Sequence, residues 1–97
     1  MTIKNSDLIP GKLYRQDKEQ TYMCFTSSIN DKSVTTHTSE NIIFIFLYKR
    51  EINEQEISGC YPFKKFGFKY YYLINSTIHY NWVYDHDLEV SWFMEVV

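Results

Sequence analysis

The chain has little of several features on which whole classes of protein depend. Its 97 residues include two cysteines, two prolines and three glycines. Two cysteines cannot build a disulfide-dense scaffold, and so few glycines leave almost no room for a loop that cradles phosphate. Gly-x-Ser-x-Gly and His-Glu-x-x-His motifs are also missing. These absences predict a protein that is not an enzyme and that uses no cofactor.

Long apolar runs and an excess of one charge are missing as well. The longest apolar run is the seven residues 42–48, whereas a membrane helix needs about 20. The first ten residues lack the basic and apolar regions of a signal peptide. We therefore expect a cytoplasmic protein with reduced thiols and no membrane partner. The net charge of −2 argues against a general nucleic-acid binder, which usually carries a basic excess.

Aromatic and β-branched residues dominate what is present. Phe, Trp and Tyr make up 19% of the chain, a content that suits strands better than helices. In residues 66–97, short polar joints at 75–77 and 85–87 separate three apolar runs, which predicts consecutive antiparallel strands. In the last run we expect one buried face, formed by Leu88, Val90, Trp92, Met94 and Val96.

The first half of the chain shows further strand and turn signals. Pro10-Gly11 predicts a type II turn before a strand that begins at Leu13. Residues 21–27 form the next expected strand, and 34–38 form either a short edge strand or an extended loop. Residues 41–50 are apolar on both alternating faces, which favours a strand covered on both sides over a buried helix.

These signals predict one all-β domain over residues 1–97, a small barrel or sandwich, with a loosely held terminus at 1–6. The middle segment, 28–59, is longer and more polar than a minimal barrel needs, so it is either an ordered part of the fold or an inserted functional loop. The expected core consists of Leu13, Phe25, Ile43, Phe44, Ile45, Phe46, Leu73, Trp82, Val90, Trp92 and Met94.

Motifs at the two ends of the chain suggest a family. The opening reads Leu8-x-Pro10-Gly11-Lys12-Leu13-Tyr14, and the closing part contains Tyr72-Leu73-Ile74, Ile78, Trp82-Val83-Tyr84, Asp87-Leu88-Glu89 and Trp92-Phe93. This combination resembles small SH3-like barrel accessory proteins of large tailed bacteriophages. The resemblance implies an SH3-like barrel or open β-sandwich of about six antiparallel strands. It also implies a protein in the host bacterial cytoplasm that binds and inhibits or redirects a host polymerase, nuclease or defence enzyme.

The leading functional hypothesis is a non-enzymatic protein-interaction module. Aromatic side chains beside charges are favoured at protein interfaces. They occur together in two segments, 61–69 and 82–87. The expected partner-binding residues are Tyr61, Phe63, Lys64, Lys65, Lys69, Tyr71, Tyr84, Asp85 and Asp87.

The alternative is a sheet that binds single-stranded nucleic acid or RNA. Bases would stack on Tyr70 and Tyr71 while Lys64, Lys65 and Lys69 meet phosphates. The same segment also fits a plain amphipathic strand, with Phe66, Phe68, Tyr70 and Tyr72 inward and Lys69 and Tyr71 outward.

A metal protein or enzyme is the third hypothesis. The segment 85–89 is the densest cluster of possible ligands, but it lacks the glycine and distant glutamate of a calcium loop. The residues Cys24, Cys60, His37, His79 and His86 lack zinc-site spacing. We therefore predict no metal site. The chain is expected to be a monomer, or a homodimer formed through an unpaired strand edge near residues 34–38.

Overall fold

The computed structural model describes residues 2–17, 23–29, 32–38, 42–53 and 67–97. All statements about structure below concern these residues. Of the expected partner-binding residues, Tyr61, Phe63, Lys64 and Lys65 lie outside them.

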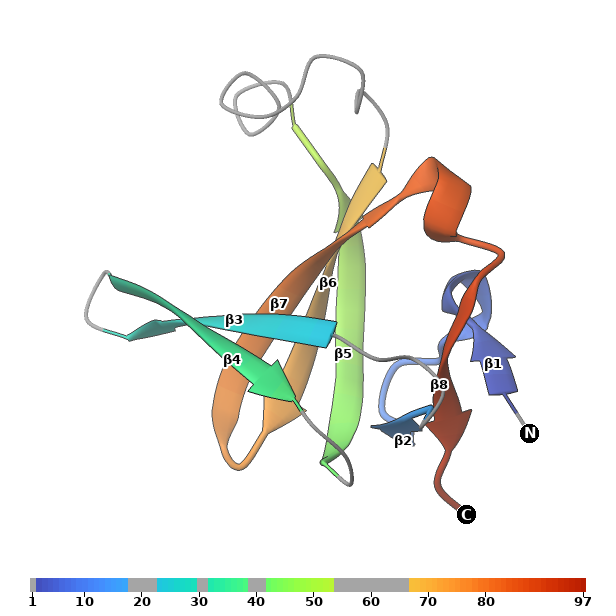
Figure 1. Ribbon diagram of the computed structural model, residues 1–97, viewed down its shortest axis with the longest axis horizontal. Coiled ribbons are helices and arrows are strands. Elements are labelled where there is room, and N and C mark those ends of the chain that lie inside the picture. Colours follow the sequence, from blue (N-terminus) through green and yellow to red (C-terminus); the bar gives the residue numbers. More distant parts are fainter. Residues whose placement is uncertain (1, 18–22, 30–31, 39–41, 54–66) are drawn as a thin grey trace.

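The described residues form one antiparallel sheet of eight strands (Figure 1). The strands are β1 (Thr2–Lys4), β2 (Leu13–Gln16), β3 (Met23–Ile29), β4 (Lys32–Thr38), β5 (Ile43–Glu51), β6 (Gly67–Ile74), β7 (Thr77–Tyr84) and β8 (Ser91–Glu95). Their order across the sheet is β1-β8-β2-β5-β6-β7-β3-β4. Two single 3-10 turns, η1 (Asn5–Asp7) and η2 (Asp85–Asp87), accompany them, and no α-helix occurs among the described residues.

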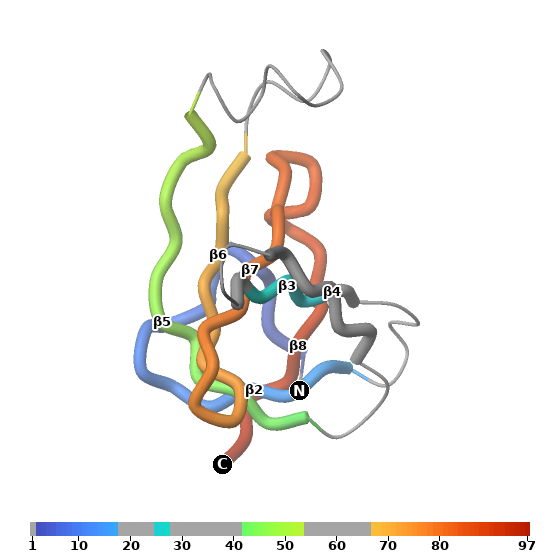
Figure 2. The backbone as a smooth tube through the Cα atoms, turned by 90° about the vertical axis from the view of Figure 1, so that its left-hand side faces the viewer, coloured from blue at the N-terminus to red at the C-terminus, as the bar shows by residue number. Residues whose placement is uncertain are grey.

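The sheet is strongly curled but not closed into a barrel. In Figure 1, β3 and β4 run across the direction of β5 and β6, and Figure 2 shows the same bend from the side. The two ends of the sheet are β1 and β4, which do not pair with each other. The all-β prediction is therefore confirmed, whereas the described sheet has eight strands where about six were expected. Residues 34–38 belong to a strand, β4, at one edge of the sheet.

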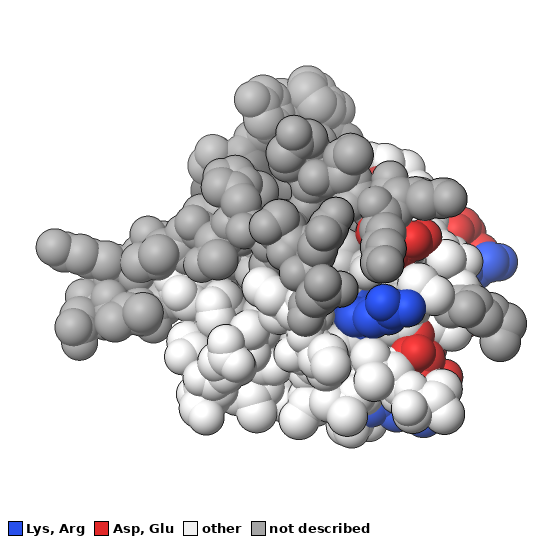
Figure 3. Space-filling view, turned by 60° about the horizontal axis from the view of Figure 1, so that its bottom comes forward, with Lys and Arg blue, Asp and Glu red and all other residues white. Residues whose placement is uncertain are grey.

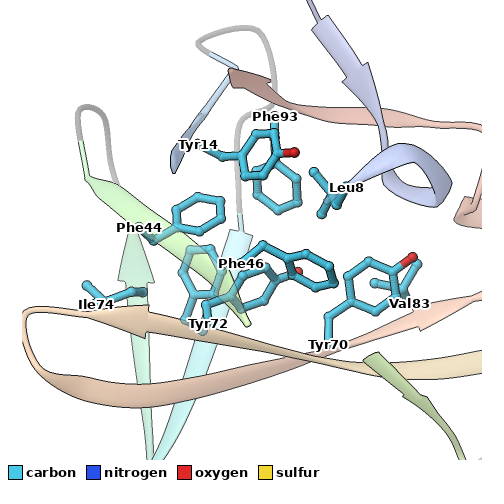
Figure 4. Close-up of a cluster of buried hydrophobic side chains, with 10 residues drawn as sticks. Leu8, Tyr14, Phe44, Phe46, Tyr70, Tyr72, Ile74, Val83 and Phe93 are labelled. Atoms are coloured by element: carbon cyan, nitrogen blue, oxygen red, sulfur yellow. The ribbon is translucent and has the colours of Figure 1, made fainter. Parts of the chain in front are cut away.

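A cluster of aromatic rings fills the inside of the curl (Figure 4). Phe44 of β5 lies at its centre, with its ring centroid 5.0 Å from those of Tyr72 and Phe93 and 5.5 Å from that of Phe25. These rings come from β3, β5, β6 and β8, so the cluster ties distant strands of the sheet together. The buried apolar residues are Leu8, Tyr14, Phe25, Phe44, Phe46, Tyr70, Tyr72, Ile74, Val83 and Phe93.

Part of the expected core is wrong, because the curl has one inner surface and large rings occupy it. Leu13 and Ile43 expose 43% and 52% of their surfaces. Phe25, Phe44 and Phe46 are buried as predicted. The remaining expected members, Ile45, Leu73, Trp82, Trp92 and Met94, are only half-buried, and Val90 is exposed. Of the run 41–50, the described residues 43–46 are thus buried on one face rather than both.

The buried face of the last strand is the opposite of the predicted one. Phe93 is fully buried against Phe44, whereas Trp92 and Met94 are half-buried. Leu88 and Val90 lie in the turn that precedes the strand, so the alternation begins only at Ser91. Only Trp92 and Met94 of the five predicted residues lie in β8, so the apolar stripe is too short there to decide which face is buried.

The N-terminal residues are held in the sheet, contrary to expectation. β1 pairs with β8, and the backbone N–H of Asn5 donates to Val90 O at 2.9 Å. The Asn5 side-chain amide donates to Asp87 O at 2.9 Å, and the backbone carbonyl of Asn5 accepts a hydrogen bond from the buried Tyr70 hydroxyl at 2.8 Å. Hydrogen bonds hold this segment in place, and no apolar pattern in its sequence reveals them.

Two turns have the geometry that their residues favour. At Pro10-Gly11 the Lys12 N–H donates to Ile9 O, and Gly11 has φ of +87°. This agrees with the predicted type II turn, which needs a positive φ at its third position. Asn75 and Ser76 connect β6 to β7 with φ of 48° and 66°. Two positive values at the centre of a two-residue hairpin define a type I′ turn.

Candidate interaction face

The side of the sheet that faces away from the aromatic core carries three rows of paired side chains. We call this side the outer face. The strand register aligns its residues across neighbouring strands. The basic row is Arg50, Lys69 and Trp82; the tyrosine row is Tyr48, Tyr71 and Tyr80; the aliphatic row is Leu13, Ile45, Leu73 and Ile78.

A β-bulge in β5 brings Tyr48 and Arg50 to the outer face. Phe46 pairs with Tyr72 and Tyr48 with Tyr71, so Leu47 is an extra residue in the ladder. Strict alternation from Phe44 and Phe46 would place Tyr48 inside the curl. The bulge reverses the alternation, which is a common result of one inserted residue. Tyr48 is consequently half exposed and stacks on Tyr71, with 4.5 Å between ring centroids and 20° between ring planes.

Lys69 lies over three aromatic rings at the centre of the outer face. Its Nζ is 4.0 Å from the ring centroid of Tyr80, 5.1 Å from that of Trp82 and 5.4 Å from that of Tyr71. An ammonium within about 6 Å of a ring face is attracted by the electron-rich π system. Lys69 and the rings around it thus hold one another in place on β6 and β7.

Arg50 is held by the tyrosine row. Its Nε donates a hydrogen bond to the Tyr71 hydroxyl at 3.1 Å, and its guanidinium carbon lies 5.8 Å from the Tyr71 ring centroid. One Nη also donates to Glu51 O at 3.2 Å. A guanidinium fixed in this way loses less conformational entropy when it makes a further hydrogen bond.

The aliphatic row leaves apolar surface exposed. Leu13 exposes 43% of its surface and Ile78 exposes 56%, and neighbouring Ile43 exposes 52%. Figure 3 looks from below Figure 1 and shows a broad uncharged surface over the lower ends of β5, β6 and β7, whereas the coloured charges gather toward the right. Exposed apolar groups that form a continuous patch are typical of a surface that another molecule covers.

Three of the expected partner-binding residues occupy outer positions. Lys69 and Tyr71 lie in the rows just described, and Tyr84 follows Trp82 by two residues on β7. Asp85 and Asp87 lie in η2, next to the end of β7. There the ring of Tyr84 stacks on that of His86, and His86 Nε2 lies 3.5 Å from Asp87 Oδ1.

Sequence reasoning named Lys69 and Tyr71 of the three rows as partner-binding residues. It missed the whole aliphatic row and four members of the other two rows, Tyr48, Arg50, Tyr80 and Trp82. Trp82 was assigned to the core, and the bulge hid the outward direction of Tyr48 and Arg50. The strict alternation in β7 could have placed Tyr80 and Trp82 together, because Val83 and Asn81 occupy the opposite, buried face.

The nucleic-acid hypothesis loses one of its stacking residues. Tyr70 has no exposed surface, and its hydroxyl donates to Asn5 O inside the molecule. Its predicted contact with a base is therefore wrong. The amphipathic arrangement describes β6 better, since Tyr70 and Tyr72 are buried, Phe68 packs against the core, and Lys69 and Tyr71 point outward.

The chain offers little sign of metal or thiol chemistry where its structure is described. No group of three His, Cys, Asp or Glu side chains comes close enough there to hold a metal ion. Cys24 pairs in register with His37 on neighbouring strands, and Cys60 lies outside the described residues. No helix among those residues is long and apolar enough to cross a membrane.

Comparison with known proteins gives no relative: no protein-family model, no curated protein and no solved structure matches this chain.

Proposed function

We propose that the chain is a non-enzymatic protein-interaction module that binds a partner protein through its outer face. The observation that carries the proposal is the joint presence of Arg50, Tyr71, Tyr80 and Trp82 on one face, around Lys69. Trp, Tyr and Arg are the residues that most often dominate the binding free energy of protein interfaces. Their mutual contacts keep the surface in one arrangement before binding, which reduces the entropy cost of association.

A protein partner fits the face better than a single-stranded nucleic acid does. The aliphatic row supplies no ring on which a base stacks, and its two ends, Leu13 and Ile78, expose 43% and 56% of their surfaces. Buried aliphatic and aromatic side chains with a polar rim are typical of protein interfaces. The resemblance to phage accessory proteins adds the class of partner, a host bacterial protein.

Affinity capture from bacterial lysate tests this function. The bait is the tagged full chain, used with and without nuclease treatment. The test variant is Tyr80→Thr/Trp82→Thr, in which β-branched replacements preserve strand propensity. The matched control, Ile9→Thr/Val90→Thr, also removes two exposed or partly exposed apolar groups, but from positions away from the outer face.

The expected result is one dominant protein that survives nuclease treatment and is captured equally by the wild type and the control. The test variant should capture at least tenfold less, because the loss of two interface aromatics costs on the order of 2 kcal/mol or more. Circular dichroism of both variants verifies folding. Equal capture by both variants would contradict the proposal, and so would partners that disappear with nuclease.

A further inference from the structure

The outer face presents two chemistries that a single partner has to match. The basic row has two cations over aromatic rings, and the aliphatic row lies on the same strands toward their other ends. Between them the tyrosine row provides stacked rings with hydroxyl groups. A partner that contacts all three rows must therefore carry negative charge at one end of its contact and apolar side chains at the other.

Charge is distributed unevenly over the molecule. The whole chain has a net charge of −2. On the described parts of β5, β6 and β7, however, outward positions include Arg50 and Lys69 and no carboxylate. Acidic side chains gather instead at η2 and the turn after it, where Glu89 pairs with Lys4. The described outward positions of these three strands thus carry two cations and no carboxylate, whereas the whole chain has a net charge of −2.

A second copy of the chain does not fit this charge pattern. A face-to-face dimer has its two-fold axis in the plane of the interface. An axis along the strands would bring the basic row onto its own copy. An axis across the strands would bring the basic row onto the aliphatic end of the face, where Ile45 pairs with Leu73. Neither arrangement places a carboxylate over Arg50 and Lys69, because the described outward positions of β5, β6 and β7 carry none.

We infer that the outer face binds an acidic, amphipathic segment of a partner protein, with carboxylates over the basic row and aliphatic side chains over the aliphatic row. This inference rests on the proposed function and specifies its partner. Along β6, the basic row and the aliphatic row are four residues apart, at Lys69 and Leu73. At 3.3 Å per residue, this separation is about 13 Å. The partner's acidic and aliphatic groups should therefore lie about four residues apart in an extended segment, or eight to nine apart in a helix.

Selection of peptides on the protein tests the inference. The probe is a displayed library of random 16-residue peptides, selected on the immobilised full chain at about 0.15 M salt, where the Debye length is about 8 Å. Selected peptides are then measured against three variants. Arg50→Gln/Lys69→Gln removes the basic row's charges, and Tyr80→Thr/Trp82→Thr removes two of the rings around Lys69. The control, Lys4→Gln/Lys12→Gln, removes two cations from exposed ion pairs elsewhere.

The expected peptides are enriched in Asp or Glu and in Leu, Ile or Phe at the stated spacings. Their affinity should fall about tenfold or more on Arg50→Gln/Lys69→Gln and stay within twofold on the control. One contrary result is a set of peptides that lose affinity on Tyr80→Thr/Trp82→Thr but lack acidic residues. Another is a set whose affinity falls on that variant and does not change on Arg50→Gln/Lys69→Gln. Either result would overturn the inference and leave the proposed function standing.

Other outcomes overturn both proposals. One is that no selected peptide is affected by Tyr80→Thr/Trp82→Thr. Another is that a labelled oligo-dT or oligo-U of 30 nucleotides binds through the same residues with a steep dependence on salt. A third is a stable dimer in light scattering that the Tyr80→Thr/Trp82→Thr variant abolishes, which would identify a second copy as the occupant.

Discussion

Tyr72→Phe should destabilise the protein through a single buried hydrogen bond. Tyr72 has no exposed surface, and its hydroxyl donates to Asn81 Oδ1 at 2.8 Å. Asn81 is itself only 8% exposed, so water does not readily replace the lost donor. An acceptor left unsatisfied inside a protein costs about 1–3 kcal/mol. For a domain of this size, each kcal/mol lowers Tm by roughly 4–8 °C.

Urea unfolding followed by tryptophan fluorescence measures this loss. The matched control is Tyr71→Phe, whose hydroxyl accepts a hydrogen bond from Arg50 on the half-buried outer face. It should change the free energy of unfolding by no more than about 0.5 kcal/mol. The double variant Tyr72→Phe/Asn81→Leu removes the donor and the acceptor together, so it should recover part of the loss.

Two results would refute this reasoning. If Tyr72→Phe and Tyr71→Phe have the same free energy of unfolding, burial does not decide the cost of losing a hydroxyl here. If Tyr72→Phe/Asn81→Leu loses as much free energy of unfolding as Tyr72→Phe and Asn81→Leu lose separately when added together, the two side chains are not energetically coupled. Either comparison holds only if the slope of the unfolding free energy against urea concentration is the same in all variants.

Three further predictions concern the backbone and the buried tyrosines. Gly67→Ala should cost about 1–3 kcal/mol in urea unfolding, because the new Cβ would lie 2.9 Å from Val83 O; an unchanged midpoint would contradict this. Ser76→Gly should raise the free energy of unfolding by about 0.5–1 kcal/mol, because Ser76 has φ of 66° and glycine adopts such angles without strain; a lower free energy of unfolding would refute it. Burial raises the pKa of Tyr70 to about 12 and that of Tyr72 well above 10. The unfolded chain therefore loses these protons first, and the free energy of unfolding should be steady below pH 10 and fall between pH 10 and 12; Tyr70→Phe should weaken that fall.

The sequence predicts the fold class well because aromatic and β-branched runs with short polar joints have few other stable arrangements. Alternation also predicts β6 correctly, where Tyr70 and Tyr72 are buried and Lys69 and Tyr71 are not. The same rule fails on β8, since only Trp92 and Met94 of the predicted stripe lie in the strand, and Phe93 packs against Phe44 in the core.

The candidate site was only partly predictable for two physical reasons. A bulge changes the direction of every later side chain in its strand, and nothing in the composition around Leu47 signals one. The site also depends on register between strands far apart in sequence, such as Arg50 beside Lys69. Alternation within a strand gives no information on which residues become neighbours across the sheet.

Oxidative footprinting of the captured complex provides a test in which the chain supplies its own control. The chain has two tryptophans, Trp82 on the outer face and Trp92 on β8, and both are half-buried in the structure. Binding through the outer face should slow hydroxyl-radical labelling of Trp82 several-fold and leave labelling of Trp92 unchanged. If the partner protects Trp92 and not Trp82, or protects neither, the partner binds elsewhere and the outer face is not the interaction site.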